Sequence, residues 1–200
     1  MSKRFALLAA LALAVLASPA ALAQESNFKI FAAVAYVSPL DSSDVSFEDV
    51  EQSVEASNEM GWMVGAEWRM TKLLGLQADY LMSTHDVEAE GDAVAEVDMS
   101  PLSAALNFHL IPGETIDVYV GAVASYVMWG DVEFDDATEI PTDDEIAYGV
   151  QVGLDFNLGE RFAIVGGLRY LMLDVTEDTS DGEEVGVDPL FATVGVAFRF

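Results

Sequence analysis

The chain has 200 residues, of which 35 are acidic, 8 are Lys or Arg and none is Cys. The formal net charge of −27 argues against a nucleic-acid partner, because proteins contact phosphate backbones through Lys and Arg. The lack of Cys excludes disulfides, cysteine-ligated zinc and thiol catalysis. Hydrophobic residues make up 52% of the chain, too many for a disordered acidic segment, so we expect one folded domain without cofactors.

The N-terminus has the layout of a secretory signal peptide. Lys3 and Arg4 form a basic start, residues 5–16 are a continuous apolar run, and Ala21 and Ala23 have the small-x-small spacing of a cleavage site. The apolar run is too short for a membrane anchor helix, which needs about 20 residues. We therefore expect a signal peptide at 1–23 and an exported mature domain at 24–200.

Eight later segments alternate between apolar and small or polar residues with a period of two, which is the pattern of strands with two different faces. In 146–158, for example, Tyr148 and Val150 lie on the apolar face, and Gly149 and Gln151 lie on the other. The eight segments are 28–37, 62–70, 73–84, 99–110, 116–129, 146–158, 162–174 and 190–200. Their length of about ten residues or more fits tilted transmembrane strands.

Short and long connections alternate between these segments. Those at 71–72, 111–115 and 159–160 are tight turns, and those at 38–60, 85–98, 130–145 and 175–189 are long. This is typical of an outer-membrane barrel, with turns in the periplasm and loops outside. A soluble β-sandwich shows the same alternation, but the second face here is rich in Gly and Ala and poor in Lys, which is unusual for a solvated face. The sequence therefore predicts an all-β, eight-stranded antiparallel up-and-down transmembrane β-barrel, in contact with the lipid of the cell outer membrane.

The last segment ends on Phe198 and Phe200 in an alternating strand. This ending resembles the recognition signal that outer-membrane barrels present to their assembly machinery. The resemblance implies that Phe198 and Phe200 contact that machinery. Further aromatic residues, among them Trp62 and Trp68, lie near segment ends on the apolar face, as expected of two interfacial girdles.

Three groups of residues resemble the OmpW family of small outer-membrane barrels. They are Ala33-Val34-Ala35-Tyr36-Val37-Ser38-Pro39 followed by Asp41-Ser42-Ser43, then Leu106-Asn107-Phe108-His109-Leu110 with Pro112-Gly113, and Val118-Tyr119-Val120-Gly121-Ala122 with Ser125-Tyr126. The wider superfamily of small outer-membrane barrels is similar over the whole mature chain. The resemblance implies a monomeric eight-stranded barrel that takes part in the passage of small hydrophobic molecules. Residues 44–59 depart from the family pattern, because they are unusually acidic.

Acidic residues are concentrated in and beside the four long connections, which hold 28 of the 35 and no Lys or Arg. A rim of one sign attracts cations, and clustered carboxylates are ligands that divalent cations prefer. Two interpretations stay open: loops that bind divalent cations, or a solvated surface that resists aggregation. The spacing at 178–182 is not that of an EF-hand, so we assign no metal ligands.

Two zones are predicted inside the barrel when the inward residues are placed by strand direction. Toward the periplasm these residues are mostly polar or charged, and charges in a narrow lumen need partners, so we expect an ion-paired network. Its predicted members are Lys29, Glu67, Arg69, Gln77, Asp79, His109, Asp117, Asp155, Arg169 and Arg199. Asn107, Tyr119, Asn157 and Arg161 are placed in the same zone.

Toward the outside the inward residues become apolar and predict a well beneath the acidic loops. The well would be lined by Val37, Met63, Leu81, Val127, Trp129, Leu171, Leu173 and Phe191, with Met99 beside them. Eight strands leave room for side chains or one small ligand rather than for a water-filled channel. Binding of a small hydrophobic ligand and plain packing of the upper lumen both stay open.

The functional hypothesis is a barrel that binds or passes a small hydrophobic solute through this well and releases it laterally. The alternative is a structural or adhesive surface barrel whose acidic loops bind cations. We do not expect an enzyme. Ser83 with His85, and Ser103 with His109, lie on shared strands, but neither pair has an evident third group to complete a nucleophile–base–orienter set.

Overall fold

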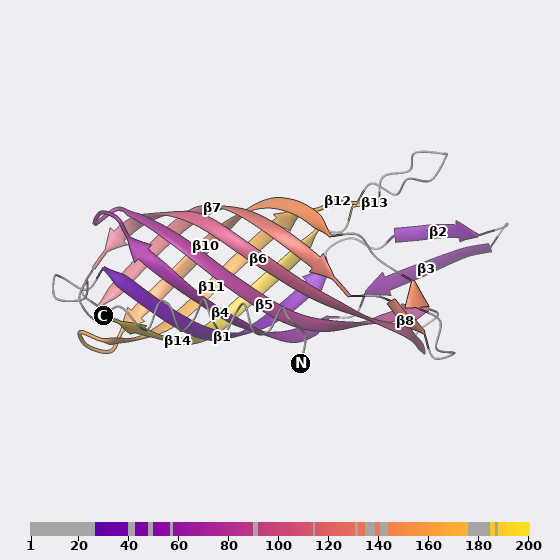
Figure 1. The fold of residues 1–200 in the computed structure, drawn as a ribbon, viewed down its shortest axis with the longest axis horizontal. Coiled ribbons are helices and arrows are strands. Elements are labelled where there is room, and N and C mark those ends of the chain that lie inside the picture. Colours follow the sequence, from indigo (N-terminus) through magenta and orange to yellow (C-terminus); the bar gives the residue numbers. More distant parts are fainter. Residues whose placement is uncertain are drawn as a thin grey trace.

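Each of the eight alternating segments forms a long strand (Figure 1). The computed structural model describes residues 27–39, 43–47, 50–56, 58–89, 92–113, 115–130, 132–134, 139–140, 144–175, 185–186 and 188–200. The long strands are β1 (Phe28–Pro39), β4 (Glu59–Arg69), β5 (Leu74–Ala89), β6 (Asp92–Pro112), β7 (Ile116–Trp129), β10 (Glu145–Asn157), β11 (Phe162–Met172) and β14 (Pro189–Arg199). The predicted signal peptide at 1–23 lies outside the described residues.

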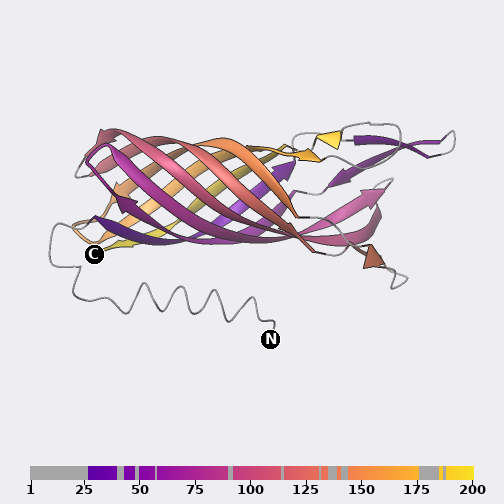
Figure 2. The same cartoon turned by 45° about the horizontal axis from the view of Figure 1, so that its top comes forward.

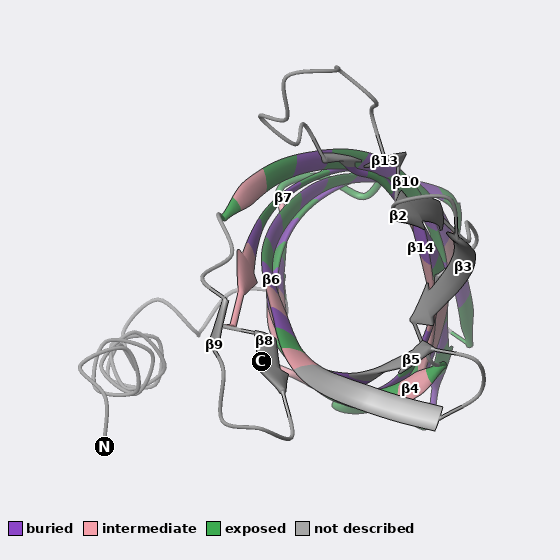
Figure 3. Cartoon of the chain, turned by 90° about the vertical axis from the view of Figure 1, so that its right-hand side faces the viewer, coloured by how far each residue is buried: buried purple, intermediate pink, exposed green. Residues whose placement is uncertain are grey.

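The eight strands close into an antiparallel barrel, which is seen end-on in Figure 3. The order around the ring is β1, β4, β5, β6, β7, β10, β11 and β14. The ring closes where β14 pairs with β1, from Lys29↔Arg199 to Pro39↔Pro189. Closure gives every long strand two hydrogen-bonded neighbours, which removes the edges that an open sheet exposes. The predicted eight-stranded up-and-down barrel is confirmed.

The two ends of the barrel differ (Figure 2). The short connections at 70–73, 113–115 and 158–161 lie at one end with the C-terminus, and we call this the turn end. The strand ends that lead into the four long connections lie at the other end, which we call the loop end. At the turn end, Thr71 Oγ1 accepts hydrogen bonds from the backbone N–H groups of Leu73 and Leu74. Gly159 has a φ of +122°, a left-handed conformation that favours glycine.

At the loop end, strand pairing continues further than the sequence predicted. We expected a loop at 85–98, but β5 and β6 stay paired there as far as Ala89↔Asp92, with a register shift between Val87 and Glu88. β3 (Val50–Ala56) joins β5 and pairs with β2 (Ser43–Phe47), and β8 (Val132–Phe134) joins β6 and pairs with β9 (Glu139–Ile140). β12 (Asp174–Val175) and β13 (Val185–Gly186) form a separate pair. These segments are short or rich in acidic residues, which is why the sequence was interpreted as loops there.

Buried and exposed residues alternate along the strands of the barrel wall, as the colours of Figure 3 show. Many of the exposed residues are large and apolar. Trp62 is 66% exposed and Val150 57% exposed, and both point outward. The outward face continues with large apolar side chains on all eight strands. A soluble monomer rarely exposes an apolar surface of this extent, whereas a lipid-facing wall requires one.

Helices do not supply a membrane crossing in the part of the chain that the structure describes: no helix there is both long and apolar enough.

Candidate functional site in the barrel lumen

Polar side chains from all eight strands meet in the lumen between the turn end and the middle of the barrel. Because side chains alternate along a strand, each strand points only a few of its residues inward at this level. The hydrogen-bonded set is Lys29 from β1, Glu67 and Arg69 from β4, Gln77 and Asp79 from β5, Ser103, Asn107 and His109 from β6, Asp117 and Ser125 from β7, Gln151 and Asp155 from β10, Arg169 from β11 and Arg199 from β14. We call this set the polar plug.

Lys29 and Asp155 form the centre of the plug near the turn end. Lys29 Nζ lies 2.7 Å from Asp155 Oδ2 and 2.6 Å from Glu67 Oε2. Arg199 Nη2 lies 2.9 Å from the same oxygen of Asp155. Lys29, Glu67 and Asp155 are all buried. Three strands, β1, β10 and β14, are therefore joined through one carboxylate, and the opposite charges offset part of the cost of burying each other.

His109 links two further carboxylates at the same level. Its Nε2 lies 2.9 Å from Glu67 Oε1, and its Nδ1 lies 2.8 Å from Asp117 Oδ1. Arg69 donates a hydrogen bond to the other oxygen of Asp117. The chain of contacts runs from Arg69 through Asp117, His109 and Glu67 to Lys29, so the acidic and basic groups are joined across the lumen.

The middle of the barrel is crossed by Arg169. Its guanidinium donates to both oxygens of Asp79 at 2.7 and 2.8 Å, to Gln151 Oε1 at 2.8 and 3.0 Å, and to Ser103 Oγ at 3.0 Å. Such a two-point contact fixes both the position and the orientation of the guanidinium. Ser103 and Ser125 are register partners, and their Oγ atoms lie 2.8 Å apart.

Amide side chains connect this middle layer to the ion pairs below it. Gln151 Nε2 donates to Asn107 Oδ1 at 2.7 Å, and Asn107 Nδ2 donates to Gln77 Oε1 at 3.0 Å and to Glu67 Oε1 at 3.2 Å. Gln77 Nε2 donates to Asp79 Oδ2 at 2.7 Å. Each amide both donates and accepts, so the charged layers form one continuous network instead of two separate ones.

The structure places all ten members of the predicted network in the plug. Arg161 differs from the expectation, because it lies in the exposed turn at 158–161. Asn157 is buried and donates to the carbonyl of Gly113 at 3.3 Å. Gln151, Ser103 and Ser125 were missed as members. The only sequence signal for these three residues was that they face inward in the segments 146–158, 99–110 and 116–129. Because their side chains are uncharged, they do not need an ion-pair partner, and nothing else marked them as members of the network.

The predicted apolar well is filled by its own side chains. Val37, Met63, Leu81, Val127, Leu171, Leu173 and Phe191 form one buried cluster with Met99, Ala35 and Ala147, and Trp129 packs against it partly buried. We call this the apolar cluster. Val127 has no exposed surface and Phe191 has 1%. The lumen is thus occupied by two stacked layers, the apolar cluster on the loop side and the polar plug on the turn side.

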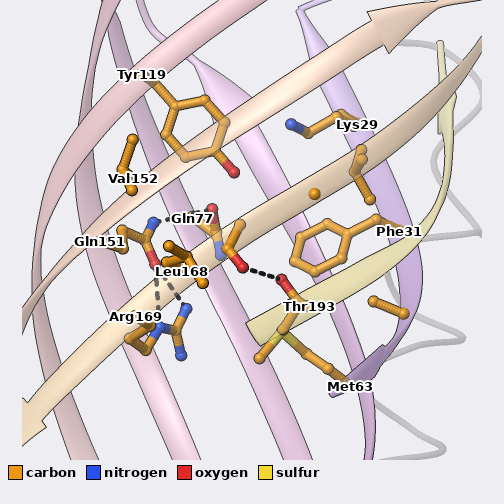
Figure 4. Close-up of a pocket in the computed structure, with 14 residues that line it drawn as sticks. Lys29, Phe31, Met63, Gln77, Tyr119, Gln151, Val152, Leu168, Arg169 and Thr193 are labelled. Atoms are coloured by element: carbon orange, nitrogen blue, oxygen red, sulfur yellow. Dashed lines mark hydrogen bonds between the residues drawn. The ribbon is translucent and has the colours of Figure 1, made fainter. Parts of the chain in front are cut away.

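A small cavity of about 40 Å³ lies where the two layers meet (Figure 4). We call it the junction cavity. Its apolar side includes Phe31 and Met63, and its polar side includes Gln77, Gln151 and Arg169. Such a volume holds a very small number of water molecules.

The junction cavity touches the barrel wall where three strands carry no bulky inward side chain. Gly153 on β10 pairs with Gly167 on β11, and Gly167 pairs with Thr193 on β14. The Tyr119 ring covers Gly153, because a Cβ at Gly153 would collide with that ring. No ring covers Gly167 in this way. The atoms nearest to a Cβ added at Gly167 would be Thr193 Oγ1 and the carbonyl oxygen of Val152, both at 3.2 Å. At Gly167 the inner side of the wall next to the junction cavity is therefore bare backbone.

An apolar groove of about 590 Å³ lies on the lipid-facing side of the same part of the wall. Its outward residues are Leu106, Phe108, Val120, Ala122, Val150, Val152, Leu168, Tyr170 and Leu190. The groove and the junction cavity have Gln151, Val152, Leu168 and Arg169 in common. These residues are two register pairs of β10 and β11, so only this strand pair separates the two spaces.

Of the two Ser–His pairs named from the sequence, the structure brings one together. Ser83 Oγ and His85 Nε2 are 3.0 Å apart and buried at the loop end. Ser83 Oγ also lies 3.3 Å from the carbonyl oxygen of Met99, a second acceptor for its proton. Ser103 instead contacts Ser125 and Arg169.

Most acidic side chains of the long connections lie outside the described part of the chain. Those that are described include Asp98, Asp144 and Asp188, which accept hydrogen bonds from Thr84, Tyr126 and Tyr170 respectively. Within the described residues, no group of three or more His, Asp or Glu side chains has the arrangement of a metal site. The expected cation binding by the loops stays a prediction.

A closed eight-stranded barrel with an apolar outer wall and a filled lumen defines the class of small β-barrel proteins of the outer membrane. The family model for the outer membrane protein beta-barrel domain matches residues 7–200, so the chain belongs to this family and is an outer membrane protein. Short turns face the periplasm in such barrels, which places the turn end there.

The chain is 28% identical to outer membrane protein AlkL of Ectopseudomonas oleovorans over 112 residues, which are 54% of this chain and 49% of AlkL. It thus spans about half the length of this curated relative. Among solved structures, OprG from Pseudomonas aeruginosa matches with a TM-score of 0.72 and 15% identity, over 88% of this chain and 96% of OprG. Neisserial surface protein A matches with a TM-score of 0.65 and 16% identity, over 88% and 98%. At these identities, the two matches show only that the folds are similar.

Proposed function

We propose that the barrel binds a small hydrophobic solute among the side chains of the apolar cluster and releases it laterally into the membrane between β10 and β11. The observation that carries this proposal is the pair of spaces on either side of the β10–β11 wall. The junction cavity and the lipid-facing groove share the residues of two register pairs, Gln151↔Arg169 and Val152↔Leu168.

The first step is capture at the loop end. The apolar cluster is packed, so a solute enters by displacing side chains. Met63 and Met99 suit this task, because methionine is unbranched and adapts its shape at low cost. A small apolar solute would replace their contacts with similar ones, whereas a charged solute would lose its hydration without compensation.

The second step is exit through the wall, because the route along the barrel axis is blocked. The polar plug lies below the junction cavity and joins all eight strands. An apolar solute would gain nothing from breaking these hydrogen bonds, whereas the lipid side of the wall offers an apolar groove. The bare backbone at Gly167 makes the wall thin at the level of the junction cavity.

The proposal agrees with the resemblance of the motifs at 33–39, 106–110 and 118–122 to the OmpW family, and we assign the chain to an OmpW-like subgroup on those motifs. The proposed role is not enzymatic, and a monomeric barrel is sufficient for it. It also assigns the polar plug a closing role, so that no continuous aqueous channel is needed.

Binding is tested by titrating the purified barrel with an apolar fluorophore such as N-phenylnaphthylamine, in competition with a short alkane. The Trp129→Ala/Leu171→Ala variant opens the apolar cluster and should change the fluorophore affinity at least several-fold. The matched control is Trp62→Ala/Leu102→Ala, which removes the same residue types from the lipid-facing surface. Unchanged binding in the first variant overturns the proposal.

Lateral exit is tested by a disulfide across the proposed wall. The natural chain has no Cys, so Val152→Cys/Leu168→Cys introduces one register pair on the outward face of β10 and β11. The control pair is Ala32→Cys/Val64→Cys between β1 and β4, also register partners that point outward. Oxidation of the first pair should slow delivery of the fluorophore into liposomes, and reduction should restore it. Equal slowing by both pairs contradicts exit between β10 and β11.

A second candidate function is a structural or adhesive role at the cell surface. It is favoured by the extension of β5 and β6 at the loop end, where β3 and β8 join them. Its test is adhesion of cells that carry the barrel, with and without a calcium chelator. Adhesion that is the same in cells with and without the barrel excludes this role.

A further inference from the structure

Basic residues are segregated at the turn end, away from the acidic loops. After residue 26 the sequence contains six Lys and Arg residues. Only Arg169 lies in the middle of the lumen, and the other five, Lys29, Arg69, Lys72, Arg161 and Arg199, lie in the turns or in the strand ends next to them. Five of these six basic residues are therefore at the turn end, where Glu67, Asp117, Asp155 and Glu160 balance most of their charge.

Four of these basic residues surround one cavity of about 420 Å³ at the turn end, which we call the vestibule. It is lined by Asn27, Phe28, Lys29, Glu67, Arg69, Lys72, Pro112, Gly113, Asp117 and Arg199. Four basic side chains face two carboxylates in this lining. The volume lies in the usual range for a small-molecule site.

The two carboxylates of the vestibule are already engaged in the floor of the cavity. Glu67 contacts Lys29 and His109, and Asp117 contacts His109 and Arg69. Their charge is thereby compensated within the polar plug. Arg199 is likewise paired with Asp155, so among the described residues that line the vestibule Lys72 is the basic group without an ion pair.

The guanidinium groups of the vestibule keep donors that the plug does not use. Arg69 and Arg199 each bond one carboxylate through Nη2, although a guanidinium has five N–H donors. Their side chains are 21% and 18% exposed, in contrast to the nearly buried Lys29. Lys72 lies in the exposed turn between β4 and β5 and extends the donor set to the mouth.

We infer that the vestibule is a binding site for a phosphate group. Guanidinium donors match the geometry of phosphate oxygens, and an ammonium group adds a point charge. The group would be either the headgroup phosphate of an anionic lipid in the periplasmic leaflet or a soluble organic phosphate. The polar plug closes the vestibule on its inner side, so the phosphate docks there and does not pass through the barrel. This site is separate from the apolar cluster and does not depend on the proposed function.

The test follows the side-chain nitrogen signals of Arg69, Arg199 and Arg161 by NMR, with the full barrel in an uncharged detergent. One arm adds glycerol phosphate, another adds short-chain phosphatidylglycerol, and chloride at equal ionic strength is the reference. We expect a saturable shift for Arg69 and Arg199 but not for Arg161. Saturation by glycerol phosphate identifies a soluble ligand, and saturation by the lipid alone identifies a headgroup. The absence of a saturable shift with both phosphates overturns the inference.

A matched pair of variants separates a built site from a diffuse positive field. Lys72→Gln and Arg161→Gln each remove one exposed charge from a turn at the same end, but only Lys72 lines the vestibule. Lys72→Gln should weaken phosphate binding roughly tenfold, the effect of losing one charged hydrogen bond. Arg161→Gln should leave it nearly unchanged. An equal loss in both variants overturns the inference in favour of nonspecific attraction.

Discussion

Arg169 and Asp79 form a two-point ion pair across the full width of the barrel. Arg169 Nη1 lies 2.7 Å from Asp79 Oδ1, and Nη2 lies 2.8 Å from Oδ2. Their strands, β11 and β5, stand opposite each other in the ring of eight. Both side chains are buried, in the part of the polar plug next to the apolar cluster. This contact joins the two halves of the wall from the inside, where no backbone hydrogen bond can reach.

Breaking this pair from one side should be strongly destabilising. Arg169→Met leaves Asp79 as a buried carboxylate without its main partner, and we expect a loss of about 3–5 kcal/mol in the free energy of unfolding. Urea titration of the barrel in detergent, followed by the mobility of the folded band, measures this loss. The double variant Asp79→Leu/Arg169→Met should lose less than the sum of the two single variants, because it leaves no unpaired charge. Additive losses would show that the pair is not coupled.

Ion conduction should require the loss of both luminal layers. We expect no stable open level for the natural barrel in a planar bilayer, because the polar plug and the apolar cluster both fill the lumen. Gln151→Ala/Arg169→Ala removes only the middle level of the plug, and Leu171→Ala/Phe191→Ala opens only the cluster, so neither pair should conduct. The four changes combined with Lys29→Ala and His109→Ala, which remove the ion-paired level of the plug, should give a conducting barrel. Conduction by the Gln151→Ala/Arg169→Ala variant alone would show that the apolar cluster does not seal the lumen.

Two glycines close to each other in the wall should respond differently to the same added methyl group. A Cβ at Gly153 would overlap the Tyr119 ring, so Gly153→Ala should cost about 1–3 kcal/mol. At Gly166, which points outward, the nearest atom to an added Cβ is the Thr193 carbonyl oxygen at 3.6 Å. Gly166→Ala should therefore be neutral or slightly stabilising. Thermal unfolding of both variants in one detergent makes the comparison, and a similar cost for both would contradict the role of Tyr119.

The C-terminal aromatic residues should matter more for assembly in the cell than for stability. The Phe198 ring lies 5.0 Å from Phe200 and 5.2 Å from Phe162 between ring centres. If the assembly machinery reads the terminal strand, Phe200→Ala should slow the appearance of folded barrel in a pulse-chase experiment. Phe162→Ala disturbs the same aromatic group without changing the terminal strand, and it serves as the control. Equal rates in both variants would remove the predicted recognition role of Phe200.

The amino-acid sequence by itself determined the strands of the barrel and the face on which each residue lies. Alternation is a local property, so Tyr148 outside and Gln151 inside could be assigned from their spacing alone. The change from charged to apolar inward residues along each segment also predicted the two luminal layers. The continuation of β5 to Ala89 was missed, because the acidic residues from Asp86 onward were interpreted as a loop.

Only the tertiary structure decided which inward residues meet. Arg169 contacts Asp79 and Gln151, whereas Lys29 takes Asp155 and Glu67, and Arg161 takes no place in the lumen. Gln151 and Glu67 are register partners on adjacent strands, whereas Asp79 and Asp155 lie on strands that do not pair with β11 and β1 respectively. Their heights depend on the stagger accumulated around the closed ring, which no single segment encodes. The thin wall at Gly167 arises in the same way, because it needs three strands to bring small residues to one level.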